Sequence, residues 1–135
     1  MKLVNFERFV DLAKALVDKN HRHVSFIVRR NKIISIGTNN LVKTHTRNLN
    51  YDYRGRKGED IRREVGVHSE LSAVLKMSEE NLTKHSLVNV RINKNGRAAM
   101  SKPCKGCLDL VRQLNFNKVY YTNNKGQFEQ LNHIK

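Results

Sequence analysis

His68-Ser69-Glu70 and the later run Pro103-Cys104-Lys105-Gly106-Cys107 constrain this 135-residue chain more than any other part of its sequence. His68, Cys104 and Cys107 supply one imidazole and two thiols, which are side chains that zinc prefers as ligands. Three protein ligands leave a tetrahedral zinc ion one position for water, as in catalytic sites. The carboxylate of Glu70, close to the histidine, can move protons beside that position. The two stretches therefore predict a catalytic zinc site with Glu70 as its general acid and base.

Both stretches also predict helices. Apolar residues recur on one side of a helix from His68 to about Ser78, and at helical spacing from Cys104 to Leu114. The second pattern places both sulfurs at the start of a helix, on the side that faces the core. Free backbone N–H groups and the positive end of the helix dipole at that position favour the thiolate form, which binds metal.

The remaining apolar segments predict one more helix and five strands. The helix is expected to begin after Asn5, a candidate N-cap, and the strands are expected at residues 24–28, 33–36, 87–92, 118–121 and 127–131. This order of elements predicts an α/β fold, a three-layer α/β/α sandwich with a central five-stranded mixed sheet. The connection after Tyr121 is short, so the last two strands should be antiparallel. We expect residues 1–135 to form a single domain.

The chain is strongly basic. It has 26 Lys and Arg against 12 Asp and Glu, a formal net charge of +14. A domain of this size with such a charge attracts polyanions, and nucleic acid is the obvious candidate partner. The positive charge is spread along the whole sequence and forms no basic tail, so solubility explains part of the excess equally well.

The first 20 residues contain charged side chains among the apolar ones, so we expect no signal peptide, no membrane span and an intracellular (cytoplasmic) location. Cys104 and Cys107 are the only two cysteines. Their spacing in a chain without an export signal favours metal or redox chemistry over a structural disulfide.

The segment from Gly37 to Gly66 is the least regular part of the sequence. A long irregular stretch in a small domain is usually functional or disordered. It contains Tyr51 and Tyr53 among basic side chains, which are Arg47, Arg54, Arg56 and Lys57. An exposed aromatic pair of this kind fits stacking on bases beside phosphate contacts, and local packing of the loop fits it equally well.

The motifs and the order of the elements resemble the cytidine deaminase-like superfamily over most of the chain. The resemblance implies a Zn²⁺ cofactor. The antiparallel ending is similar to that of free cytidine deaminases and bacterial deaminase toxins, which favours cytosine over adenine. The resemblance implies a hydrolase of a C–N bond: water attacks C4 of cytosine, Glu70 protonates N3 and then the departing amine, and uracil and ammonia are the products. It also implies that the backbone N–H of Ser69 and the backbone carbonyl of Lys102 hold the base.

A second resemblance covers Asn40-Leu41-Val42-Lys43-Thr44-His45, which is similar to a Gly-x-Asn-x-x-Lys-Thr-His run of phage and bacterial deaminase-like proteins. One extra residue follows Gly37, so counting back from His45 selects Asn40 and counting forward selects Asn39. We assign Asn40 as the residue that binds the sugar of the substrate, with Asn39 as the alternative. His45 either packs against the base or caps the loop.

We predict a deaminase of cytosine in single-stranded nucleic acid. One alternative is a deaminase of free cytidine, deoxycytidine or their monophosphates, in which one or two basic residues of 47–57 bind a phosphate. Another is a non-catalytic, zinc-stabilised nucleic-acid-binding domain, against which Glu70 argues.

A structural zinc site would need a fourth ligand from His21, His23, His85 or His133, and a redox-active cysteine pair is a further alternative. Members of the superfamily are often dimers or tetramers, so a homo-oligomer is one expected state of this chain.

Overall fold

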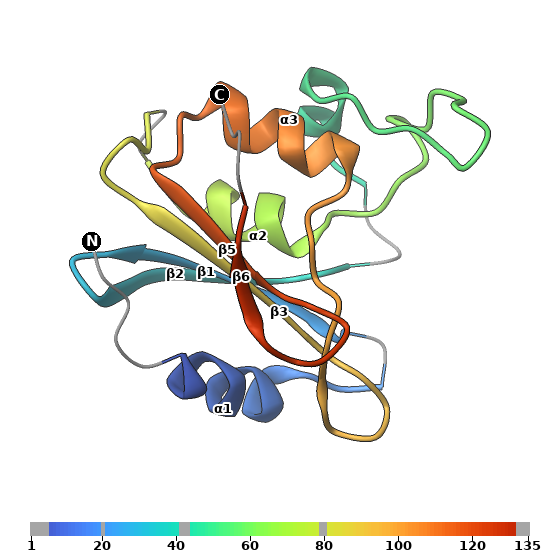
Figure 1. The fold of residues 1–135 in the computed structure, drawn as a ribbon. Coiled ribbons are helices and arrows are strands. Elements are labelled where there is room, and N and C mark those ends of the chain that lie inside the picture. The colour runs from blue at the N-terminus through green and yellow to red at the C-terminus, as the bar shows by residue number, and fades with distance from the viewer. Residues whose placement is uncertain (1–5, 20, 41–43, 79–80, 132–135) are drawn as a thin grey trace.

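The structure is a computed structural model that describes residues 6–19, 21–40, 44–78 and 81–131. Its centre is a mixed sheet with strand order β2-β1-β3-β5-β6 (Figure 1). A short additional strand, β4, pairs with the end of β3. The strands are β1 (His23–Arg29), β2 (Lys32–Thr38), β3 (Ser86–Ile92), β4 (Ala98–Ala99), β5 (Lys118–Thr122) and β6 (Phe128–Gln130).

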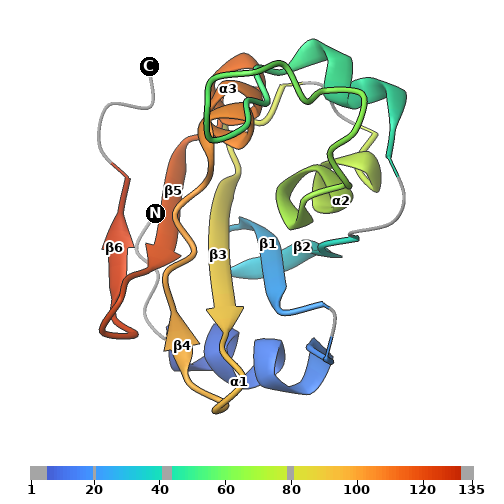
Figure 2. The same cartoon turned by 90° about the vertical axis from the view of Figure 1, so that its right-hand side faces the viewer.

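Helices cover both faces of this sheet. Helix α1 (Glu7–Leu16) lies on one face, and α2 (Ser69–Leu75) and α3 (Lys105–Gln113) lie on the other (Figures 1 and 2). The predicted three-layer α/β/α sandwich is therefore confirmed, and β4 is the strand that the sequence pattern did not predict. Helix α2 ends at Leu75, earlier than the expected Ser78. Asn5, the expected cap of the first helix, lies outside the described residues.

Strand directions follow the lengths of the connections. The β3–β5 pair is parallel, with α3 in the connection between the two strands. The β5–β6 pair is antiparallel, as predicted, and Gly126 in its turn has a φ of 77°. Strands β1 and β2 are joined by a two-residue turn in which Arg30 and Asn31 have φ of 52° and 64°. Positive φ at both turn residues matches the twist of a tight hairpin.

The two faces of the sheet have different chemistry because side chains alternate along a strand. On the α1 face, Phe9 packs with apolar residues of β1 and β3, namely Val24, Phe26, Val28, Val88, Val90 and Ile92. On the α2 and α3 face, Ile27 and Leu87 join a second core. Ser25 and Asn89 have the same strand parity as Ile27 and Leu87, so this second face carries polar side chains toward α2 and α3.

The segment before α2 contains the short 3-10 helix η1 (Thr46–Asn50) and contacts α3, whose Asp109 accepts a hydrogen bond from the backbone N–H of Asp52 at 3.0 Å. Tyr51 is 3% exposed and Tyr53 is 1% exposed, so the expectation of an exposed aromatic pair is wrong. The two rings belong to the core on the α2 and α3 side, where burial of their large apolar surface outweighs exposure to solvent. Among the helices of the described residues, none has the length and apolar character needed to cross a membrane.

Candidate active site

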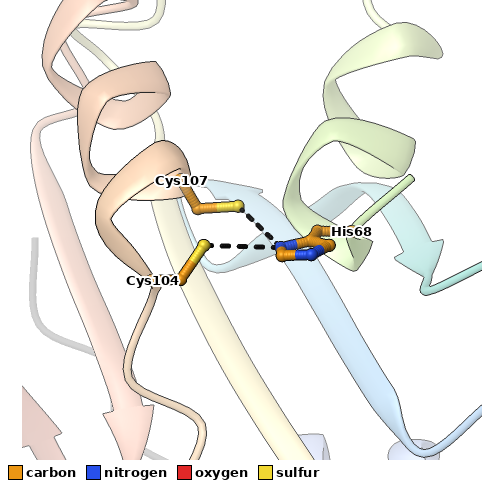
Figure 3. A group of neighbouring side chains, drawn as sticks. All are labelled: His68, Cys104 and Cys107. Atoms are coloured by element: carbon orange, nitrogen blue, oxygen red, sulfur yellow. Dashed lines mark hydrogen bonds between the residues drawn. The ribbon is translucent and has the colours of Figure 1, made fainter. Parts of the chain in front are cut away.

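The three predicted metal ligands meet where α2 and α3 begin. His68 is the N-cap of α2, Cys104 is the N-cap of α3, and Cys107 lies in the first turn of α3. Their ligand atoms all lie within 4.8 Å of one another, and Nδ1 of His68 is 3.5 Å from each sulfur (Figure 3). Within the described ranges no other His, Cys, Asp or Glu joins this group. His21, His23 and His85 are thus not fourth ligands here, and His133 lies outside the described residues.

The donor set fits zinc. One imidazole nitrogen and two sulfurs match the ligand types that zinc selects, and three ligands leave one position free for water. A hydrogen bond from Cys107 lowers the pKa of the Cys104 thiol to about 4. Burial raises the pKa of the Cys107 thiol well above its ordinary value. A divalent cation between the two sulfurs would take the place of the Cys107 proton and balance both thiolates.

Tyr53 supports this cluster from the side of the irregular segment. Its hydroxyl oxygen lies 3.2 Å from the Cys107 sulfur. Its ring meets the His68 ring edge to face, with centroids 5.1 Å apart. Position 106 is glycine because a Cβ there would overlap the Tyr53 ring. Tyr53, predicted as a nucleic-acid contact, is therefore a neighbour of two candidate metal ligands.

A cavity of about 200 Å³ opens beside the cluster. It contains three residues predicted for the site besides the ligands: Glu70, Ser69 and Lys102. Its full lining consists of His23, Asn39, His68, Ser69, Glu70, Ser101, Lys102 and Cys104. The sequence motifs that are far apart in the chain thus converge on one cavity.

The lining includes Asn39 and not Asn40, which favours the alternative, Asn39, for the sugar contact. Asn39 follows β2, and its Oδ1 accepts a hydrogen bond from the backbone N–H of His23 at 3.1 Å. Asn40 instead pairs through its backbone with Val67, to whose carbonyl it donates at 2.7 Å. The side chains of adjacent residues in extended backbone point to opposite sides. A shift of one position in the sequence match therefore decides which of the two asparagine side chains faces the cavity.

His45 does not line this cavity either. It is the N-cap of η1, and its ring Nδ1 accepts a hydrogen bond from the backbone N–H of Arg47 at 3.0 Å. Of its two proposed roles, capping the loop is the one that the structure has. Leu41, Val42 and Lys43, which belong to the same sequence resemblance, lie outside the described residues.

The basic residues of the irregular segment also lie away from the cavity lining. Arg54 pairs with Asp52 at 2.8 Å, and Nε of Arg47 donates to the Tyr51 hydroxyl at 3.1 Å. Arg56 and Lys57 are exposed. Part of the positive charge of this segment is thus already matched by protein groups, and its contact with nucleic acid or phosphate stays a prediction.

Glu70 is 6% exposed and belongs to a closed ring of four side chains. Nδ2 of Asn89 donates to Oε2 of Glu70 at 3.0 Å, and the hydroxyl of Ser69 lies 3.1 Å from Oε1. The hydroxyls of Ser69 and Ser25 are 2.7 Å apart, and Ser25 donates to Oδ1 of Asn89 at 2.7 Å. We call these four side chains the Glu70 ring. Ser25 and Asn89 were not predicted, although a polar residue inside each of two apolar strands was a signal for them.

Both carboxyl oxygens of Glu70 accept hydrogen bonds in this ring. Ser69 donates to Oε1, and the Asn89 amide donates to Oε2. Burial, which favours the neutral carboxyl, raises the pKa of Glu70. A raised pKa makes this carboxyl group a better proton acceptor than an exposed one.

His23 also lines the cavity, although the sequence made it a candidate only for a fourth zinc ligand. It begins β1 and pairs with Arg91 of β3. Burial lowers the pKa of His23 to about 4, and the positive charges of Arg91 and His68 act in the same direction. A neutral imidazole therefore lines the cavity at neutral pH.

Comparison with known protein-family models and with curated proteins finds no match for this sequence. By structure, the chain has the cytidine deaminase-like fold, with the His-Cys-Cys group at the expected helix starts. It is similar to the dCMP deaminase from the cyanophage S-TIM5 in apo form, with 19% identity and a TM-score of 0.53 over 88% of this chain and 80% of the other. The same enzyme in complex with dCMP and dUMP gives 19% identity and a TM-score of 0.55 over 92% and 85%.

Proposed function

We propose that this chain is a zinc-dependent hydrolytic deaminase that converts cytosine to uracil in a nucleotide substrate. The observation that carries this proposal is that the group His68, Cys104 and Cys107 lies beside a cavity that His68, Cys104 and the buried Glu70 line. A structural zinc site needs no buried carboxylate beside it, whereas hydrolytic deamination needs a proton carrier at that place. The fold is in agreement with the proposal.

The chain's own residues divide the reaction between them. His68, Cys104 and Cys107 would hold zinc, which when bound supplies a Lewis acid that makes water nucleophilic near neutral pH. Glu70 accepts the proton of the attacking water and delivers protons to N3 of the base and to the departing amine. The backbone N–H of Ser69 and the backbone carbonyl of Lys102 hold the base at its carbonyl and amino groups. Cytosine and water thereby give uracil and ammonia.

The nucleotide is the substrate class that we favour, and single-stranded nucleic acid is the second candidate. Burial of Tyr51 and Tyr53 removes the aromatic pair on which the polymer hypothesis partly rested. The S-TIM5 dCMP deaminase, which was solved with dCMP and dUMP, supports a free nucleotide. The net charge of +14 is the observation that favours a polymer.

The test is ammonia release by the zinc-loaded protein from deoxycytidine, dCMP and cytosine-containing single-stranded DNA and RNA at low salt. Glu70→Gln should keep zinc and fold and lose about 10²- to 10⁴-fold in turnover, because general acid and base catalysis contributes that much. Glu64→Gln, an exposed carboxylate close to α2 in the sequence, is the matched control and should behave like the parent.

Each outcome assigns one function. Turnover of dCMP without turnover of oligonucleotides selects the free nucleotide, and turnover of oligonucleotides alone selects the polymer. Absence of ammonia from every substrate, together with tight binding of nucleic acid and unfolding on chelation, would replace the enzyme with a zinc-stabilised binding domain.

A further inference from the structure

Ser25 and Asn89 lie directly opposite each other on neighbouring strands. They are Cα partners in the antiparallel β1–β3 pair, with Ser25 0% exposed and Asn89 3% exposed. Directly opposite residues of a sheet have their side chains on the same face and close together. The face in question carries α2, so the pair points at the helix that bears Glu70.

The amide of Asn89 is fixed at both ends. Its Oδ1 accepts from Ser25, and its Nδ2 donates to Glu70 and to the backbone carbonyl of Ser101, the latter at 3.3 Å. The Ser101 hydroxyl in turn donates to the backbone carbonyl of Asn89 at 2.9 Å. A flipped amide would lose both donations by Nδ2. The orientation that presents an N–H to Oε2 of Glu70 is therefore set by the rest of the network.

Side chains of the sheet thus fix the orientation of the Glu70 carboxyl group, which belongs to helix α2. Helix α2 fixes the backbone of Glu70 but leaves the carboxyl group free to rotate about its side-chain bonds. The Glu70 ring holds Oε2 through Asn89 and Oε1 through Ser69, which Ser25 holds in turn. A proton carrier must lie within hydrogen-bond reach of the reacting atoms, and a misplacement of about 1 Å can cost about 10²-fold in rate.

We propose that Ser25 and Asn89 are positioning residues that hold the Glu70 carboxyl group in its working orientation in the cavity. This role rests on the proposed deaminase function, since it concerns the residue that moves the protons. Neither Ser25 nor Asn89 lines the cavity, so their effect passes through Ser69 and Glu70. They should influence the chemical step and leave binding of nucleotide and zinc alone.

Ser25→Ala tests this role, with Ser35→Ala as its matched control. Ser35 is also a buried serine of the same sheet, but its hydroxyl donates to the backbone carbonyl of Ala73 at 2.8 Å and is not part of the Glu70 ring. We expect Ser25→Ala to lower kcat for dCMP about tenfold or more, while the affinity for dUMP and the zinc content stay at the parent values. Ser35→Ala should leave kcat near the parent value. Equal kcat in the two variants, or a change in dUMP affinity in place of kcat, would overturn the proposal.

A double variant separates positioning from a general structural effect. In the Glu70→Gln background the carboxyl group is absent, so Ser25→Ala should cause no further loss of residual activity. A serine that only supports the fold would reduce activity by the same factor in both backgrounds, and this result would also overturn the proposal.

Side-chain amide signals of Asn89 in NMR spectra provide a readout that needs no turnover. Glu70→Gln and Ser25→Ala should both shift these signals in the zinc-loaded protein, and Ser35→Ala should not. If the parent protein releases no ammonia from any cytosine substrate, the proposed function fails, and the positioning role fails with it. In that case, shifted Asn89 signals would still show that the hydrogen bonds of the Glu70 ring exist. In an active enzyme, unshifted Asn89 signals would overturn the positioning role and leave the proposed function intact.

Discussion

The hydroxyl group of Tyr53 lies 3.2 Å from the sulfur of Cys107, a metal ligand candidate more than 50 positions later in the chain. The tyrosine comes from the segment that shows little apolar periodicity, yet it is 1% exposed. An O–H donor beside a thiolate stabilises its negative charge, as other groups around metal ligands do. The irregular segment therefore contacts the candidate metal site, although none of the three candidate ligands belongs to it.

Tyr53→Phe should weaken zinc binding about tenfold, because groups that hydrogen-bond to a metal ligand typically change metal affinity by about 10- to 100-fold. Competition with a zinc chelator at constant pH measures the effect. Tyr51→Phe is the control: this tyrosine is also buried, but its hydroxyl accepts from Arg47. Equal zinc affinity in the two variants would contradict the role of the Tyr53 hydroxyl.

Gly106→Ala should destabilise the protein by about 1–3 kcal/mol, since the added methyl group overlaps the buried Tyr53 ring and must displace it. Urea unfolding of the zinc-loaded protein measures this change. Lys105→Ala alters the neighbouring position of the same helix, where the side chain is exposed and forms an ion pair with Asp52 at 3.1 Å. An unfolding midpoint for Gly106→Ala as high as that of Lys105→Ala would show that the ring has room to move.

Local sequence signals were sufficient to place the three candidate metal ligands. His68, Cys104 and Cys107 lie at helix starts, so a short motif and the helical period together specify their positions. The antiparallel β5–β6 pair was predictable for a similar reason, because a short connection leaves no other direction. Strand β4 has only two residues, Ala98 and Ala99, and no pattern can be read from so short a segment.

The features that could not be predicted from the sequence depend on packing between segments that are distant in the chain. Tyr53 is buried because Gly106 and His68, which are distant in the chain, form its surroundings. The choice between Asn39 and Asn40 depended on where β2 ends, and a shift of one residue reverses the side of the strand. Ser25 and Asn89 are each a polar residue inside an apolar strand, which is visible in the sequence. Their pairing depends on the register of β1 and β3, which is not.

His23 should make the stability of the protein fall as the pH decreases. Burial lowers its folded-state pKa to about 4 from an ordinary 6.5, so between these values the unfolded chain binds a proton that the folded chain does not. The contribution of a neutral His23 is therefore complete above pH 6.5 and is lost as the pH falls towards 4. His23→Gln should remove this part of the pH dependence from urea unfolding of the zinc-loaded protein. Parallel curves for the parent and His23→Gln would refute the prediction.

Asn39 and Asn40 provide a direct comparison for substrate binding. Asn39 lines the cavity, and if its amide bonds the sugar, Asn39→Ala should raise KM about three- to tenfold with little change in kcat, as expected for one neutral hydrogen bond. Asn40→Ala should keep the parent KM, because that residue pairs with Val67 outside the cavity lining. Steady-state kinetics with dCMP measures both, and urea unfolding identifies any loss that comes from stability, since Oδ1 of Asn39 also accepts from the backbone of His23. A raised KM in Asn40→Ala alone would return the sugar contact to Asn40 and require the chain after β2 to shift by one residue when substrate binds.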